Sequence, residues 1–244
     1  MVRCQDQGLK TDCFVRQYRQ TTEWSVLSKD ELRRIDDVAV CRIHKVGTDV
    51  FREGEPCRGI YYVRNGLVGV RKSDPEGNSV ILWRLAFPGN TLGLRPLLAE
   101  ESHRGGAEVL ETSTICFVSI SVIRDVLKNS PALEHRFLQS AARALGDAEE
   151  AYFENVTQSV RTRLAHVLSI FKDHSGKTAD DGSIVLDLPL TWRNISALIG
   201  VRPESMSRVI RKLDDEGWAH FSGRTVYVRD FDGLMGEIGP DRGV

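Results

Sequence analysis

The chain has 244 residues, of which 41% are hydrophobic and 27% charged, and its formal net charge is −1. That length suits one large domain or two moderate ones, each able to bury a core. No apolar run approaches the length that spans a bilayer, and the N-terminus has no signal-peptide core. We therefore expect a cytoplasmic protein with no membrane partner, and the near-neutral charge argues against a general polyanion binder.

The first part of the chain predicts a short helix followed by many short strands. Residues 28–31, Ser-Lys-Asp-Glu, have the form of a capping box, which predicts a helix start. Glycines then recur at Gly54, Gly66, Gly77 and Gly89, the turn spacing of a β-sandwich or barrel. The clearest predicted strands are 60–63, 67–70, 79–83 and 114–118, with a turn at 74–78.

From Pro131 the pattern changes to that of one long helix. Its apolar residues recur every three or four positions between charged flanks, which is typical of a coiled-coil partner face. We therefore predict a dimerisation helix, and the alternative is that the same seam packs against the chain's own barrel. The predicted dimer interface consists of Leu133, Phe137, Ala141, Leu145, Ala148 and Tyr152.

The stretch 191–218 predicts a helix, a tight turn at Gly200 and a second helix with two different faces. Apolar residues form one face, whereas Glu204, Ser207 and Arg208 share the other because they are three and four positions apart. This is the layout of a helix-turn-helix whose second helix enters the major groove of DNA. Arg can bind guanine there, Glu can accept from cytosine, and Ser suits either base, so we predict that these three side chains read bases.

The flanks of this motif indicate a winged helix. A strand is predicted over 183–188, and a hairpin is predicted over 218–228. Between Arg193 and Lys212 there are five basic residues and one acid, a local excess that fits DNA phosphates. Arg202 occupies the predicted N-cap before Pro203, where it cannot accept from the first-turn amides, and its alternative is a solvated side chain. The predicted backbone contacts are Arg193, Arg202, Ser205, Arg211 and Arg224.

Five short motifs are distributed along nearly the whole chain. They are Glu53-Gly54-Glu55 with Tyr61-x-Val63-x-x-Gly66, Asp74-x-x-Gly77, Pro88-Gly89-Asn90-x-x-Gly93, Arg161-x-Arg163-Leu164-Ala165 and Glu204-x-x-Ser207-Arg208. With the barrel, long helix and winged helix, they resemble the Crp/Fnr family of bacterial transcription regulators. The resemblance implies an α+β fold: an N-terminal cyclic-nucleotide-binding-like β-barrel (a jelly roll), a dimerisation helix and a C-terminal winged helix-turn-helix. The expected divisions are an arm at 1–26, the barrel at 27–130, the dimerisation helix at 131–158, the DNA-binding domain at 159–232 and a tail at 233–244.

Within that family the chain is most similar to the Fnr branch. Glu204-x-x-Ser207-Arg208 resembles the Fnr motif, which reads an inverted repeat of TTGAT-type half-sites. Pro203 stands where the cyclic-AMP receptor branch has an arginine, so that branch's half-site is not expected. The resemblance implies double-stranded DNA as a partner, a homodimer, and RNA polymerase as a further partner by analogy.

The resemblance also bears on what the barrel binds. The family's cyclic-nucleotide cassette has Glu after its glycine and Ser or Thr after its arginine, whereas here Gly93 precedes Leu94 and Arg104 precedes Gly105. Cyclic AMP is therefore not expected as the effector. Arg95 and Arg104, near Gly93, are left as candidates for another anion or as solvated side chains.

The chain has five cysteines, and a cytosolic protein is not expected to keep them for disulfides. Cys4, Cys13 and Cys116 resemble cysteines of oxygen-sensing Fnr proteins that hold an iron–sulfur cluster, but Gln7 replaces the middle cysteine. Four alternatives stay open: a cluster with a substitute ligand, a thiol redox switch, haem, or barrel cysteines that serve only as small buried hydrophobes. The further residues concerned are Asp6, Cys41 and Cys57 as substitute ligands or thiols, and His44 and His103 as haem ligands.

We therefore predict a dimeric, sequence-specific transcription regulator switched by a redox, gas or small-molecule signal. One alternative is a ligand-binding or redox-sensing dimer without a DNA role, which the basic residues of the second helix argue against. The other is a cupin-type enzyme, which needs clustered metal ligands such as H-x-H. The six histidines are scattered, and no G-x-S-x-G, P-loop or H-E-x-x-H motif occurs, so we predict no enzymatic activity.

Overall fold

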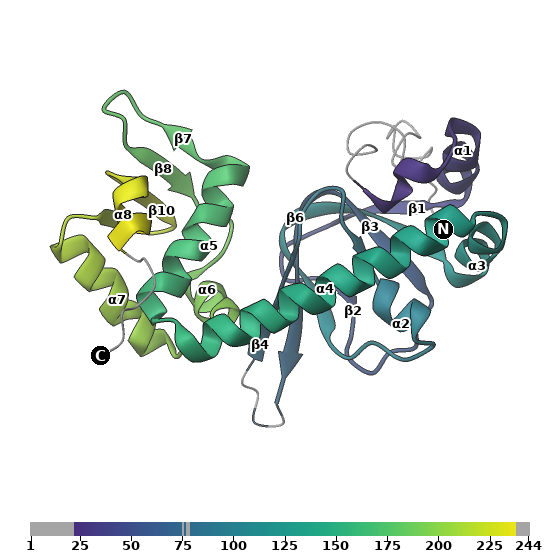
Figure 1. The fold of residues 1–244 in the computed structure, drawn as a ribbon, viewed down its shortest axis with the longest axis horizontal. Helices are drawn as coiled ribbons and strands as arrows, with labels where there is room; N and C mark the ends of the chain where they lie inside the picture. Colours follow the sequence, from purple (N-terminus) through teal and green to yellow (C-terminus); the bar gives the residue numbers. More distant parts are fainter. Residues whose placement is uncertain (1–21, 75, 77–78, 238–244) are drawn as a thin grey trace. The chain divides into compact units, whose positions relative to one another are not determined.

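The computed structural model describes residues 22–74, 76 and 79–237, and the chain divides into two compact units. The first unit comprises residues 1–78 and 84–147, and the second comprises 79–83 and 148–244. The long helix α4 (Pro131–Thr157) contributes residues to both (Figure 1). No helix in the described ranges is long and apolar enough to cross a membrane.

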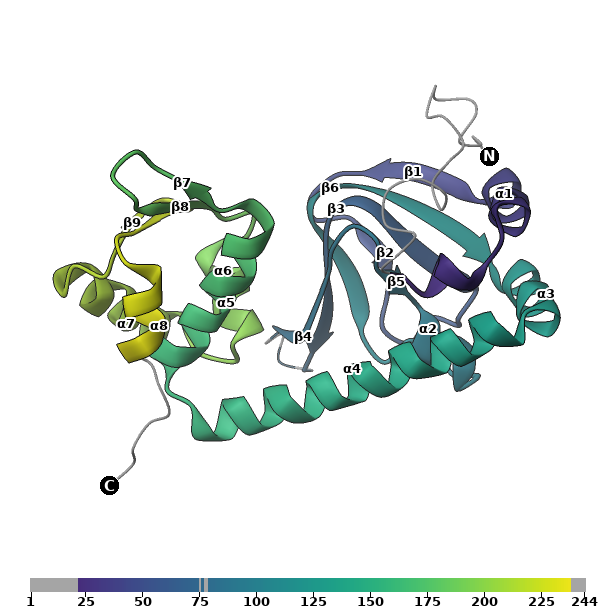
Figure 2. The same cartoon turned by 45° about the horizontal axis from the view of Figure 1, so that its top comes forward.

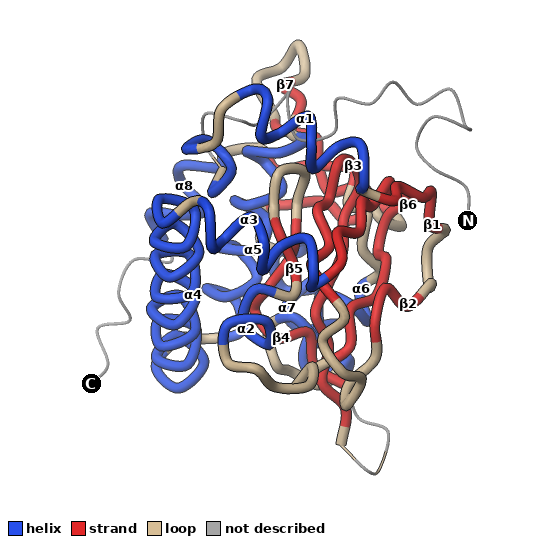
Figure 3. The backbone as a smooth tube through the Cα atoms, turned by 90° about the vertical axis from the view of Figure 1, so that its right-hand side faces the viewer, coloured by secondary structure: helices blue, strands red, loops and turns tan. Residues whose placement is uncertain are grey.

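The first unit is built on a six-stranded sheet, whose strands are red in Figure 3. The order is β1–β6–β3–β4, with β2 paired to β6 and β5 paired to β3. All four strands predicted from the sequence are present, in β3, β4 and β6, while the predicted turn at 74–78 lies mostly outside the described residues. The strands are β1 (Val40–His44), β2 (Asp49–Phe51), β3 (Gly59–Ser73), β4 (Ser79–Ala86), β5 (Thr91–Leu92) and β6 (Gly106–Ser119).

The predicted strands 60–63 and 67–70 are parts of one strand, β3, so the turn expected at Gly66 is wrong. Gly66 has a φ of 84°, and the pairing of β3 with β6 shifts register around it. A Cβ at this position would lie 2.2 Å from Ser113 Oγ, so only glycine fits. A bulge and a tight turn both favour a residue with positive φ, which is why the glycine spacing did not distinguish them.

The helix predicted from the capping box is α1 (Lys29–Val38). The backbone N–H of Glu31 donates to Ser28 Oγ at 3.3 Å, and the backbone N–H of Ser28 donates to Glu31 Oε2 at 2.8 Å. The Ser28 hydroxyl also donates to Glu31 Oε2 at 2.6 Å, and this bond, together with that from the Ser28 backbone N–H, lowers the pKa of Glu31. Both amides would otherwise lack a partner inside the helix, so the box defines where α1 begins.

The start of α4 belongs to the core of the first unit. Leu133 and Phe137 are fully buried there, and the Phe137 ring meets the Trp24 ring edge-on with centroids 5.5 Å apart. The prediction of these two residues as dimer contacts is therefore wrong, because they pack against the chain's own sheet. The helices that share this core are the 3-10 helix η2 (Glu23–Val26), α1, α2 (Leu94–Leu98), α3 (Ile120–Asn129) and the first turns of α4, of which Figure 2 labels the four α-helices.

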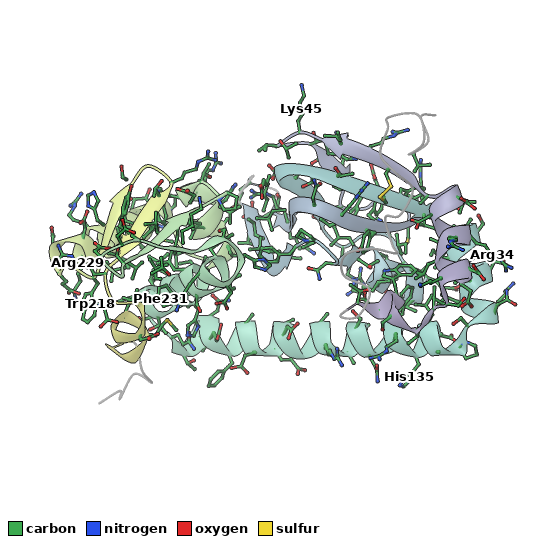
Figure 4. All side chains as sticks on the ribbon, turned by 90° about the horizontal axis from the view of Figure 1, so that it is seen from above. Arg34, Lys45, His135, Trp218, Arg229 and Phe231 are labelled. Carbon is green, nitrogen blue, oxygen red and sulfur yellow. A yellow bond between two sulfur atoms is a disulfide. The ribbon has the colours of Figure 1, made fainter. Side chains whose placement is uncertain are left out.

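Cys41 and Cys116 form a disulfide, the yellow bond in Figure 4. The two residues are direct partners in the antiparallel pair β1–β6, and both side chains are almost fully buried. The expectation that the cysteines form no disulfide is therefore wrong, because the register places two of them opposite each other. Cys57 is a half-buried free thiol, while Cys4 and Cys13 lie outside the described residues.

The second unit contains a four-stranded antiparallel sheet in the order β7–β8–β10–β9, with helices packed beside it. The predicted strand before the helix-turn-helix and the predicted hairpin after it are β8, β9 and β10. Part of the segment expected as a loose tail forms the last helix, in which Phe231 and Leu234 are buried. The elements are α5 (Val160–Ser175), β7 (Lys177–Thr178), β8 (Ile184–Asp187), α6 (Trp192–Leu198), α7 (Pro203–Asp215), β9 (Ala219–Ser222), β10 (Thr225–Val228) and α8 (Phe231–Glu237).

Candidate nucleic-acid interface

The two faces predicted for the second helix of the motif are present on α7. Met206 and Leu213 are buried against the second unit, whereas Glu204, Ser207 and Arg208 are exposed. The helix begins at Pro203, and Arg202 at the N-cap makes no side-chain capping hydrogen bond, as its chemistry requires. The sequence therefore predicted correctly which side of α7 faces outward.

The exposed face of α7 keeps its hydrogen-bonding groups available. Within the described part of the chain, neither Glu204 nor Arg208 forms an ion pair or a side-chain hydrogen bond. Ser207 Oγ donates to the Pro203 carbonyl at 3.0 Å, which leaves its oxygen able to accept. One carboxylate, one hydroxyl oxygen able to accept and one guanidinium thus share one face, and the two charged groups have no competing partner among the described residues, as base recognition requires.

Four of the five predicted backbone contacts are exposed arginines: Arg193 on α6, Arg202 before α7, Arg211 on α7 and Arg224 in the turn between β9 and β10. None of them has an ion pair among the described residues, and Ser205, the fifth, is half-buried. Unpaired exposed arginines are suited to phosphate, because no internal carboxylate has to be displaced. Lys212, which also contributed to the basic excess, lies 3.8 Å from Glu216 instead.

The turn between β9 and β10 is attached to α6 by Trp192, a residue that sequence reasoning missed. The indole N–H of Trp192 donates to the Gly223 carbonyl at 2.7 Å, and its ring lies edge-on to Phe221 with centroids 5.4 Å apart. The amide of Leu188 donates to the Arg224 carbonyl at 2.9 Å. These contacts hold the backbone on both sides of Arg224, and no local pattern reveals a contact between residues 31 positions apart.

In the first unit, the two arginines predicted for an anionic effector are both bound to Glu101. Arg95 Nη1 lies 2.9 Å from Glu101 Oε2, and Arg104 Nη2 lies 3.0 Å from Oε1. Hydrogen bonds from Arg95 and Arg104 lower the pKa of Glu101. Gly93 adopts the left-handed conformation before α2, where a Cβ would lie 2.9 Å from the Gly59 carbonyl. The structure brings the arginines together, but an anion would have to compete with Glu101 for them.

Those residues considered for a metal or haem that the structure describes are not gathered into a site, and Cys4, Asp6 and Cys13 lie outside the described residues. Across residues 22–74, 76 and 79–237, no three His, Cys, Asp or Glu side chains are placed to hold a metal ion. His103 is buried with its ring stacked on Phe51 at 3.8 Å, and burial lowers its pKa. Burial also lowers the pKa of His44, which is half-exposed. Cys116 is in the disulfide, so in this state it offers no thiolate for a cluster.

A β-rich unit of this topology followed by a winged helix-turn-helix defines the class of DNA-binding proteins with a cyclic nucleotide-binding-type domain. Residues 42–130 match the family model of the cyclic nucleotide-binding domain, and residues 162–236 match that of the Crp-like helix-turn-helix domain.

The chain is similar to curated regulators over most of its length. It is 27% identical over 192 residues to the "cAMP-activated global transcriptional regulator CRP" of Haemophilus influenzae, covering 77% of this chain and 84% of that one. It is 22% identical over 232 residues to "Electron transport regulator A" of Shewanella oneidensis, covering 94% of this chain and 87% of that one.

Solved structures show the same fold. FixK2 from Bradyrhizobium japonicum matches with a TM-score of 0.71 at 22% identity, covering 85% of this chain and 99% of that one. A CRP/FNR-family transcriptional regulator from Thermus thermophilus matches with a TM-score of 0.67 at 25% identity, covering 83% of this chain and 100% of that one. Together, the two domain matches and the relatives support membership of the Crp/Fnr family of DNA-binding transcription regulators.

Proposed function

We propose that this protein is a homodimeric transcription regulator of the Fnr type, which binds an inverted repeat of TTGAT-type half-sites. The observation that carries the proposal is the exposed row of Glu204, Ser207 and Arg208 on α7, in which the two charged groups have no partner in the described residues. Its partners are double-stranded DNA in the cytoplasm and, by analogy with the family, RNA polymerase. Glu204, Ser207 and Arg208 read bases, and the arginines around them bind phosphates.

The dimer is proposed from a second seam on α4. Leu138, Leu145, Tyr152 and Val156 are large apolar side chains with exposed fractions of 53%, 61%, 73% and 69%. With Ala142 and Glu149 they recur every four and three positions, which is the heptad spacing of a two-stranded coiled coil. A row of exposed apolar side chains this long indicates a covered surface, and a second copy of α4 matches its spacing. Leu145 and Tyr152 of the original prediction lie on this seam.

A palindromic DNA site needs two reading helices related by two-fold symmetry, with half-sites about one helical turn apart. A pairing of α4 with a second copy supplies that symmetry. Small residues beside the seam, Ala141 and Gly146 among them, leave room for the two helices to approach. Glu149 is the charged residue on the seam, and it would oppose its own copy in a parallel pair, which weakens association.

For the signal, we propose redox chemistry, which the Cys41–Cys116 disulfide supports. The Cys41–Cys116 disulfide lies in the same core cluster as Leu133 and Phe137, which seat the first turns of α4. Two electrons and two protons from a dithiol reductant would convert it to two thiols, which need more room in a closely packed core. The redox state of the first unit would thereby act on the helix that carries the dimer seam.

The base-reading assignment is tested with a panel of duplexes that vary one position of a TTGAT inverted repeat. Replacing Arg208 by Ala should cost about 1–3 kcal/mol and relax the preference at one base pair, whereas Arg224→Ala should weaken binding to all sequences alike. Fluorescence anisotropy of labelled duplexes measures both. An Arg208→Ala protein with unchanged sequence preference would show that the assignment is wrong.

A further inference from the structure

We propose that Arg163 and Asn155 form a relay through which the C-terminal end of α4 sets the position of the reading helix α7. The inference rests on the proposed function, because it assigns a positioning role within the same DNA-reading site. Every contact involved lies within the second unit, which contains the last turns of α4 as well as α5, α6 and α7.

Arg163 is a buried arginine on α5 that contacts two other elements at once. Its Nη1 donates to Asn155 Oδ1, on the last turn of α4, and to the Ile199 carbonyl at 2.6 Å. Ile199 is the C-cap of α6 and begins the turn that leads into α7. A single guanidinium therefore connects the end of α4 with the turn of the helix-turn-helix.

Asn155 is itself fixed on α4. Its Nδ2 donates to the Ala151 carbonyl at 2.8 Å, one helical turn earlier, which orients its Oδ1 toward Arg163. At the turn, Gly200 has a φ of 65°, and a Cβ there would lie 3.5 Å from Asn155 Oδ1. The end of α4 is thus close to the turn as well as bonded to it through Arg163.

The other end of α7 is also tied to α5. Arg161 Nη1 lies 2.5 Å from Glu216 Oε2, and Glu216 is the C-cap of α7. Arg161 and Arg163 stand two positions apart near the start of α5, directly after the corner between α4 and α5. A movement of this corner would therefore displace both ends of α7 together, as a rigid element.

The hydrogen bonds of this corner are not all satisfied in the present arrangement. Burial lowers the pKa of Arg163, while the nearby Glu154 raises it, and both atoms that accept from its Nη1 are neutral oxygens. Among the described residues, Gln158 Oε1, Arg161 Nη2 and Arg163 Nε are buried without a partner. One unused acceptor and two unused donors, all within residues 158–163, leave groups free for a different set of hydrogen bonds in a second arrangement of this corner.

The test compares Asn155→Ala with Thr157→Ala in the full-length protein. Both residues donate from the side chain to the carbonyl four positions earlier on α4, but only Asn155 contacts Arg163. For each variant, anisotropy gives the dissociation constants for a TTGAT inverted repeat and for a scrambled duplex of equal length. The readout is the dissociation constant for the scrambled duplex divided by that for the inverted repeat. A protein that is merely less folded loses affinity for both duplexes by the same factor, so this ratio does not change.

We expect Asn155→Ala to lower this ratio about tenfold, since a hydrogen bond to a charged group is lost and α7 is no longer held in register with the bases. Thr157→Ala should leave the ratio unchanged, and Asn155→Asp should preserve it because the carboxylate still accepts from Arg163. Arg163→Lys, whose single ammonium cannot span both acceptors, should lower it as Asn155→Ala does.

If the unmodified protein does not discriminate between the two duplexes, the proposed function fails and the relay fails with it. If it discriminates, and both Asn155→Ala and Arg163→Lys retain the full ratio, the relay alone is wrong and the reading face of α7 stands. An equal loss in Thr157→Ala would likewise overturn the relay, because that residue does not contact Arg163.

Discussion

Trp192 provides a sharp test of how the wing contributes to DNA binding. Replacing Trp192 by Phe keeps an aromatic ring beside Phe221 but removes the hydrogen bond to the Gly223 carbonyl, which is 2.7 Å long. A neutral hydrogen bond of good geometry contributes about 1 kcal/mol. A dimer bound to a palindrome has two wings, so the loss is about 2 kcal/mol, or about a thirtyfold weaker dissociation constant.

The physical reason is the position of Arg224, the residue that follows Gly223 in the turn. A wing that is no longer held by Trp192 loses the phosphate contact of Arg224 in each subunit. Because each phosphate contact contributes about 0.9 to the slope of log affinity against log salt concentration, the slope should fall by about two. Affinity for scrambled duplexes should fall along with affinity for the operator, since phosphates carry no sequence information.

The assay is anisotropy of a labelled inverted repeat between about 50 and 200 mM salt, for Trp192→Phe, Arg224→Ala and the double variant. In the Arg224→Ala background, Trp192→Phe should have no further effect. Trp218→Phe is the matched control, because no hydrogen bond from its indole occurs among the described residues (Figure 4 labels this side chain). Additive losses in the double variant, or an unchanged salt slope in Trp192→Phe, would refute the reasoning.

Three further outcomes are expected. Glu149→Leu should tighten dimerisation about a hundredfold in sedimentation equilibrium, because it buries one leucine per subunit in the seam. Glu150→Leu, which lies off the seam, should leave the dimerisation constant unchanged. Equal effects of the two substitutions would show that this seam is not the dimer interface. Dithiothreitol should lower the free energy of unfolding in urea by about 4 kcal/mol, because the Cys41–Cys116 disulfide joins residues 75 positions apart. The control variant Cys57→Ala, which lacks the free thiol, should lose the same amount when dithiothreitol is added. An unaffected free energy would mean that the bond is absent in solution. Burial holds the pKa of His103 below that of the unfolded chain, so the free energy of unfolding is full above about pH 6.5 and declines as the pH falls through the folded pKa. His103→Phe should flatten this decline, apart from the part that His44 contributes, because burial lowers its pKa as well. An identical pH profile in His103→Phe would contradict the assignment.

Local patterns in the chain determined much of the DNA-binding unit. The two faces of α7 follow from helical periodicity alone, because residues three and four positions apart share a side whatever the rest of the fold does. The start of α1 follows in the same way from Ser28 and Glu31, whose hydrogen bonds are made within four residues. The wing strands were visible because alternating residues and a glycine turn are local as well.

Only the tertiary structure decided which apolar residues of α4 are covered and which are free. Leu133 and Phe137 repeat with helical spacing just as Leu145 and Tyr152 do, but the first pair meets the sheet and the second pair does not. Periodicity identifies the residues that need burial without naming the surface that buries them. The same limit explains Gly66, where one local conformation serves either a turn or a bulge.

The Cys41–Cys116 disulfide, the Trp192–Gly223 contact and the link from Asn155 through Arg163 to Ile199 were likewise beyond the sequence. Each depends on the register or packing of elements far apart along the chain, and that register is set by the sum of many weak contacts across whole strands and helices. Short-range patterns thus determined what α7 offers to DNA, whereas the three-dimensional packing decided what holds α7 and its wing in place.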